Sequence, residues 1–116
     1  MVVFPDLSDA ELDRLFRALA DATRRDIVSR LFSGEGASVS TLAARYDMSF
    51  AAVQKHVAFL EEAGLVTKHP QGRERIVRGN PERIARAREL LSQLEDLWRA
   101  RFSRLDAVLA EPNPRE

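Results

Sequence analysis

The spacing of apolar residues changes at Gly64, and this change constrains the fold more than any other feature of the sequence. Before Gly64 the apolar residues recur at helical spacing, and the clearest run is Val53, Val57 and Leu60. After it, two short strand-forming runs, 65–68 and 74–77, flank a glycine-containing loop at 70–73. Residues 39–79 therefore indicate a short helix, a tight turn, a second helix capped by Ser49 and a hairpin. This order predicts a helix-turn-helix with a β-hairpin wing.

Three further helices are predicted around this block. They start after Ser8, near Ala22 and at Pro81. The first has Glu11 at the spacing of a capping box. We expect a mainly α fold with a small β-hairpin wing, an α+β winged helix-turn-helix with elements in the order ααααββα. One domain is expected over residues 1–110, with its last helix at about 81–110, and the tail 111–116 is expected to be disordered.

The last predicted helix carries an apolar stripe that is too extensive to leave in water. Its members recur every seven positions as Ile84, Leu91, Trp98 and Leu105. Apolar residues of the first helix can pack beside this stripe, which predicts a homodimer formed through the first and last helices. The candidate interface residues are Leu12, Leu15, Leu91, Leu94, Trp98, Phe102 and Leu105. Trp98 and Phe102 have a second interpretation, in which they line a pocket for a small-molecule effector.

The helix after Ser49 suits the major groove of double-stranded DNA, because its outward face carries small or hydrogen-bonding side chains. Gln54 can pair with an adenine edge, and Lys55 can reach a guanine or a phosphate. At the hairpin tip, Arg73 can enter the minor groove or contact phosphate. The candidate DNA-binding residues are Ser49, Phe50, Ala51, Gln54, Lys55, His56, Gln71, Arg73 and Arg75. For two of them an alternative stays open: Phe50 could fold against the core, and His56 could orient the helix through a hydrogen bond.

Composition excludes several functional classes. The chain has no cysteine, which rules out disulfides, thiolate metal sites and cysteine nucleophiles. It also lacks a glycine-rich phosphate loop and a nucleophile with a neighbouring base, so neither an enzyme nor a cofactor is expected. No apolar run reaches the roughly 20 residues of a membrane helix, and the first residues do not resemble a signal peptide. We therefore expect a cytoplasmic protein.

The charge balance leaves one alternative to DNA binding. The 18 basic and 18 acidic residues cancel, although residues 63–80 hold four cations against one anion. A neutral protein still binds DNA if its cations converge on one face. A winged-helix module that binds protein instead would expose an apolar patch in place of Gln54 and Lys55.

Three runs of the sequence resemble the ArsR/SmtB family of bacterial repressors over about residues 12–109. The runs are LFRALADATRRDIVSRL, STLAARYDMSFAAVQKHVAFLEEAGLV and GRERIV. The resemblance implies a homodimer whose first and last helices pair, a recognition helix at 49–63 and a wing at 65–77. It also implies a repressor, which as a dimer would bind a near-palindromic operator with half-sites about one helical turn apart.

The sequence departs from the metal-sensing members of that family. Those members carry a cysteine cluster in the third helix, or histidine and acidic ligands on the last helix. This chain has no cysteine, and its two histidines, His56 and His69, lie in the recognition helix and the wing. The later run WRARFSRLDAVL is similar to a subgroup without metal sites. Because transition metals prefer thiolate or imidazole ligands, transition-metal sensing is not expected.

Overall fold

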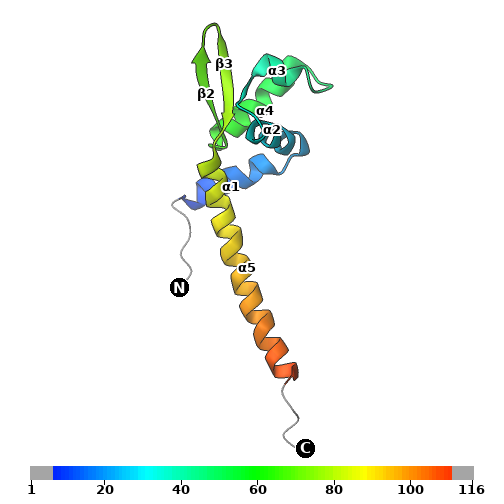
Figure 1. Cartoon of the computed structure of the whole chain (residues 1–116), viewed down its shortest axis with the longest axis vertical. Helices are drawn as coiled ribbons and strands as arrows, with labels where there is room; N and C mark the ends of the chain where they lie inside the picture. The colour runs from blue at the N-terminus through cyan, green and yellow to red at the C-terminus, as the bar shows by residue number, and fades with distance from the viewer. Residues whose placement is uncertain (1–6, 111–116) are drawn as a thin grey trace, which may run out of the picture.

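The computed structural model describes residues 7–110, which form five helices and a three-stranded antiparallel sheet (Figure 1). The helices are α1 (Asp9–Leu19), α2 (Ala22–Phe32), α3 (Val39–Ala43), α4 (Phe50–Glu62) and α5 (Pro81–Ala110). The strands are β1 (Ala37–Ser38), β2 (Val66–Gln71) and β3 (Glu74–Gly79). The expected α+β winged helix-turn-helix is confirmed. The tail at 111–116 and residues 1–6 lie outside the described residues.

Side-chain caps explain where the helices begin. The Ser8 hydroxyl accepts a hydrogen bond from the Glu11 amide (3.1 Å), and the Glu11 carboxylate accepts one from the Ser8 amide (3.2 Å). These two bonds complete the predicted capping box of α1. The side chains of Asp21, Ser38 and Ser49 each accept one amide hydrogen bond at the starts of α2, α3 and α4. Each cap satisfies an amide that the helix itself leaves unpaired.

The strand β1 was not expected from the sequence, so the order ααααββα is corrected by one element. β1 pairs Ala37 with Val77 and Ser38 with Ile76 of β3, which gives the sheet order β1-β3-β2. Two residues cannot show the alternation that identifies a strand. The pairing instead depends on β3, which lies about forty positions later in the sequence.

The wing hairpin is tighter than the expected loop at 70–73. Gln71 pairs with Glu74, so only Gly72 and Arg73 form the loop. Gly72 has φ +65°, and a positive φ at the first of two loop residues is typical of a type II′ turn. Pro70 can belong to β2 because β2 is an edge strand, where a missing amide donor leaves no neighbouring strand unpaired.

The buried core lies where α1–α4 meet the base of the sheet. Its fully buried large side chains are Leu15, Ile27, Leu42, Val53, Val57, Leu60, Leu65, Val66 and Val77. Leu12 and Leu15 are only 6% and 0% exposed within one chain. These two side chains are therefore covered by their own chain, and their place in a dimer interface stays a prediction. An amphipathic pattern shows which face is buried, but it does not show whether the covering surface comes from the same chain.

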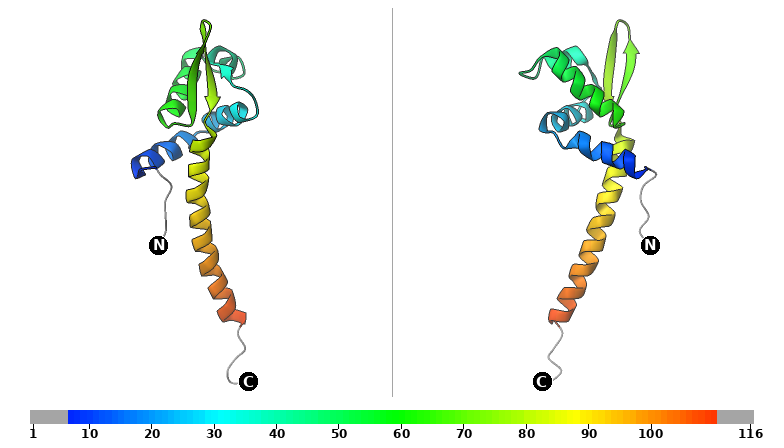
Figure 2. Two further views of the ribbon diagram at one scale, coloured as in Figure 1. Left: turned by 60° about the vertical axis from the view of Figure 1, so that its left-hand side comes forward. Right: turned by 180° about the vertical axis from the view of Figure 1, so that it is seen from behind.

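The helix α5 extends away from this body, on the side opposite to the wing (Figure 2). Its 30 residues span about 45 Å at 1.5 Å per residue, and Ala87 is the one residue of α5 that is buried. The other interface candidates are exposed: Leu91, Leu94, Trp98, Phe102 and Leu105. Among the described residues, no helix is both long and apolar enough to cross a bilayer.

Candidate nucleic-acid interface

The recognition helix α4 and the wing enclose a groove. It is lined by Ser38, Val39, Ser40, Phe50, Gln54, Lys68, Arg73, Glu74 and Arg75. Four predicted DNA-binding residues, Phe50, Gln54, Arg73 and Arg75, are therefore brought together from α4 and from the wing that follows it in the sequence. An amide able to read a base edge and two guanidinium groups able to contact phosphate share one surface.

The other predicted contact residues lie around this groove. Ala51 and Lys55 are exposed on α4, and Gln71 is exposed at the end of β2. The Ser49 hydroxyl accepts a hydrogen bond from the Ala52 amide at 3.1 Å, so its oxygen already serves as the α4 cap. Phe50 is 49% exposed and does not fold into the core. The alternative in which Phe50 packs inward is therefore not supported.

His56 faces the body of the protein rather than the groove. Its side chain is 23% exposed, and its Nδ1 lies 4.0 Å from an oxygen of Asp21. The same nitrogen lies 3.4 Å from a guanidinium nitrogen of Arg24. These contacts favour the alternative in which His56 orients α4, and they move it away from direct DNA contact.

Arg24 connects three helices and so fixes where α4 lies. Its guanidinium donates hydrogen bonds to the carbonyl oxygens of Ala18 (2.7 Å) and Arg17 (3.0 Å) at the end of α1. It also stacks on the Phe59 ring of α4, 4.2 Å from the ring centroid. The amide of Arg24 donates to the Asp21 carboxylate, and this bond is the main cause of the lowered pKa of Asp21. A cation at a helix C-terminus and over an aromatic ring is favourable on both counts.

A second set of contacts holds the helix-turn-helix against α2. The Tyr46 hydroxyl, which follows α3, donates a 2.6 Å hydrogen bond to the Asp26 carboxylate of α2. Arg30 donates to the same carboxylate oxygen at 2.8 Å. The hydrogen bonds from Tyr46 and Arg30 lower the pKa of Asp26. Burial and the bond to Asp26 raise the pKa of Tyr46 to about 12.

Lys68 and Ser40 are groove residues that the sequence analysis missed. The Lys68 side chain is 17% exposed, and its Nζ lies 3.6 Å from an oxygen of Glu61 on α4. Lys68 falls within the predicted strand 65–68, whereas the predicted DNA contacts of the wing are at its tip and on the following strand. The available signal was its position on β2, near the recognition helix.

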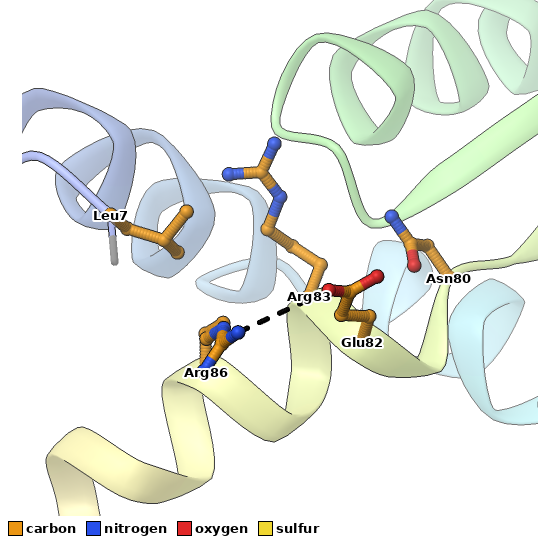
Figure 3. Close-up of a pocket in the computed structure, with 5 residues that line it drawn as sticks. All are labelled: Leu7, Asn80, Glu82, Arg83 and Arg86. Carbon is orange, nitrogen blue, oxygen red and sulfur yellow. Dashed lines mark ion pairs between the residues drawn. The ribbon is translucent and has the colours of Figure 1, made fainter. Parts of the chain in front are cut away.

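A small pocket lies at the junction of α1 and α5, lined by Leu7, Asn80, Glu82, Arg83 and Arg86 (Figure 3). Its arginines already have carboxylate partners: Arg83 is 3.1 Å from Glu11, and Arg86 is 4.0 Å from Glu82. The Arg83 hydrogen bond is the main cause of the lowered pKa of Glu11. This pocket is a structural junction that joins α5 to α1. Within residues 7–110, no cluster of three histidine or acidic side chains could hold a metal ion.

Comparison with known proteins identifies the family. A family model described as a helix-turn-helix domain matches residues 19–69. The HTH-type transcriptional regulator Rv2034 of Mycobacterium tuberculosis is 40% identical over 86 residues, 74% of this chain and 77% of that protein. The arsenical resistance operon repressor of Escherichia coli is 30% identical over 96 residues, 83% of this chain and 80% of that protein.

A solved structure agrees with these relatives. An ArsR-like transcriptional regulator from Rhodococcus sp. RHA1 is 32% identical and has a TM-score of 0.74, covering 90% of this chain and 96% of that chain. All of these proteins are named as transcriptional regulators or repressors, and none as an enzyme. The chain therefore belongs to the ArsR family of winged helix-turn-helix transcriptional regulators.

Proposed function

We propose that this regulator is a repressor that binds a near-palindromic operator as a homodimer and does not respond to transition metals. The observation that carries the proposal is the groove between α4 and the wing, which Gln54, Arg73 and Arg75 line together. In this arrangement Gln54 reads an adenine edge in the major groove, and the two arginines contact the adjacent phosphates or minor groove. Lys55 on the same helix reaches a guanine or a phosphate.

The exposed apolar residues of α5 support the homodimer. Leu91, Trp98 and Leu105 are 54%, 62% and 53% exposed on a helix that extends from the body. A contiguous apolar surface of this kind marks an interaction site. The winged helix-turn-helix domain of Mb0332 from Mycobacterium bovis, 25% identical with a TM-score of 0.61, is described as homodimeric. Repression is supported by the name of the Escherichia coli relative.

The available side chains support a regulator that does not sense transition metals. The chain offers no thiolate, and His56 is held against Asp21 and Arg24 in the body. His69 lies on the exposed wing, where its Nε2 is 2.9 Å from the Thr67 hydroxyl oxygen. Two separated imidazoles do not make the three- or four-ligand set that such a metal requires.

Selection from a random pool of DNA duplexes by the purified protein tests the proposal. The expected result is enrichment of an inverted repeat with half-sites about 10 bp apart, centre to centre. An Arg73→Ala variant should recover the same repeat with weaker binding to every sequence, because it removes a backbone contact. If folded, dimeric protein enriches no sequence, the proposal is wrong and the protein-binding module becomes the better interpretation.

A further inference from the structure

Phe50 is an aromatic side chain that contributes little to the packing of its own chain. It is 49% exposed at the first position of α4, and it lies outside the core and the apolar residues that pack against the core. Within residues 7–110, no aromatic ring and no cation stacks on it. The part of a phenylalanine that stays in water gives no hydrophobic stabilisation. A contact from outside the chain would therefore explain why this position carries a phenyl ring.

Two other phenylalanines of the body are exposed to a similar extent, but both have contacts within the chain. Phe32 and Phe59 are each 40% exposed. The guanidinium of Arg24 stacks on Phe59, 4.2 Å from the ring centroid. The ring of Phe32 lies so close to Gly79 that a Cβ atom added there would be 2.8 Å from it. Phe50 differs from both because its exposed surface has no such contact.

The Phe50 ring lines the groove that the proposed operator would occupy. Phe50 and Gln54 are the two α4 residues that line this groove, opposite the arginines of the wing. They are four residues apart and therefore lie on the same face of the helix. In a helix-turn-helix, the first residues of the recognition helix contact base edges. Phe50 is thus placed to touch a base next to the one that Gln54 reads.

A phenyl ring has no hydrogen-bonding group, and this limits what it can recognise in the major groove. Among the four bases, thymine is the one that presents an apolar group there, its 5-methyl. The other bases present nitrogen and oxygen atoms, which a phenyl ring would desolvate without giving them a hydrogen bond. The base that fits Phe50 is therefore a pyrimidine with a methyl group at its 5-position.

We propose that Phe50 reads the 5-methyl group of one thymine in each half-site of the operator. This inference rests on the proposed operator binding and adds a second base to the adenine assigned to Gln54. Along α4 the two residues are about 6 Å apart at 1.5 Å per residue, and stacked bases are about 3.4 Å apart. The thymine therefore lies within about two base pairs of that adenine, on either strand.

Replacement of thymine by deoxyuridine tests the contact, because uracil differs from thymine by the methyl group alone. In the selected duplex, each pair of thymines related by the dyad is replaced in turn, and fluorescence anisotropy gives the Kd. One pair should raise the Kd by about 15-fold, which is about fourfold for one buried methyl in each half-site. The F50A variant should bind the thymine duplex at least that much more weakly, and the same deoxyuridine pair should weaken its binding no further.

Two more variants and one modified base separate the methyl contact from other effects. Phe50→Leu keeps an apolar side chain, so the deoxyuridine pair should still weaken its binding. Gln54→Ala is the matched control: it loses affinity, but the phenyl ring remains and so should the effect of deoxyuridine. Cytosine in place of the thymine pair should weaken binding by the wild type, and 5-methylcytosine should restore about 15-fold of it. F50A should not distinguish cytosine from 5-methylcytosine. Circular dichroism checks that each variant is folded.

The outcomes separate this inference from the proposed function. If the wild type binds an inverted repeat but no deoxyuridine pair weakens binding, the methyl contact is wrong while operator binding stands. The same conclusion follows if deoxyuridine weakens binding by F50A as much as binding by the wild type. If the wild type selects no DNA sequence, operator binding itself fails and the inference fails with it.

Discussion

Trp98 is the side chain whose removal should weaken the dimer most. It is 62% exposed on α5 and lies 5.9 Å from the Phe102 ring, centroid to centroid. A buried aromatic side chain covers about 150–250 Å², so Trp98 has about 120 Å² left to bury against a partner. At about 25 cal/mol per Å², this is about 3 kcal/mol per copy and about 6 kcal/mol per dimer. At 1.4 kcal/mol per tenfold, the Kd of the W98A dimer should rise by as much as about 10⁴-fold.

Sedimentation equilibrium from submicromolar to high micromolar concentration measures this change. Trp98 lies outside the buried core, so W98A should keep its helical circular dichroism while it loses the dimer. Arg99→Ala is the control, because this neighbour is also exposed but lies outside the apolar face. A W98A dimer whose Kd stays within tenfold of the wild-type value would refute the assignment of this face to the interface. The effector-pocket interpretation of Trp98 would then be preferred.

Three further predictions concern the groove and its support. Gln54→Ala should cost about 1–3 kcal/mol of operator binding and relax the preference at one base position. Fluorescence anisotropy with the four base variants at that position measures both effects. An unchanged base preference would rule out the proposed docking. Glu61→Gln releases Lys68 from its ion pair. The affinity for DNA of every sequence should therefore rise severalfold, and its dependence on salt should become steeper. A fall in affinity would contradict this prediction. The lowered pKa of Asp26 stabilises the fold above the usual pKa of aspartate, and this stability is lost as pH falls. Tyr46→Phe removes the hydrogen bond that is the main cause of this lowered pKa. In urea unfolding from pH 7 to pH 3, the variant should have a lower free energy of unfolding at neutral pH. It should also lose less of that free energy in acid than the wild type does.

Local chemistry made much of the fold predictable. Helix starts depend on a cap and the residues directly after it, and Ser8 and Ser49 were identified on that basis. The hairpin was indicated by Gly72 between two strand-forming runs, although strand pairing extends two residues further into the loop than expected. The groove followed from this, because α4 and the wing are adjacent in the sequence and pack together.

The remaining features depend on contacts between distant parts of the chain. The strand β1 exists because β3 offers it a partner, and Leu15 is fully buried within its own chain. The position of His56 on the recognition helix leaves two interpretations open, a DNA contact and a hydrogen bond that orients the helix. Its environment is set by Asp21 and Arg24, more than thirty positions earlier, and no spacing rule on α4 reveals them.

Hydroxyl-radical footprinting on the selected duplex tests the central claim most directly, since it shows both the contact and its symmetry. A homodimer with two recognition helices should protect two patches related by a dyad, with centres about 10 bp apart. Both patches should disappear together in the W98A variant at concentrations that preserve binding by the wild type. One patch without a symmetric counterpart, or protection that W98A leaves intact, would contradict a dimeric repressor that reads DNA through α4 and the wing.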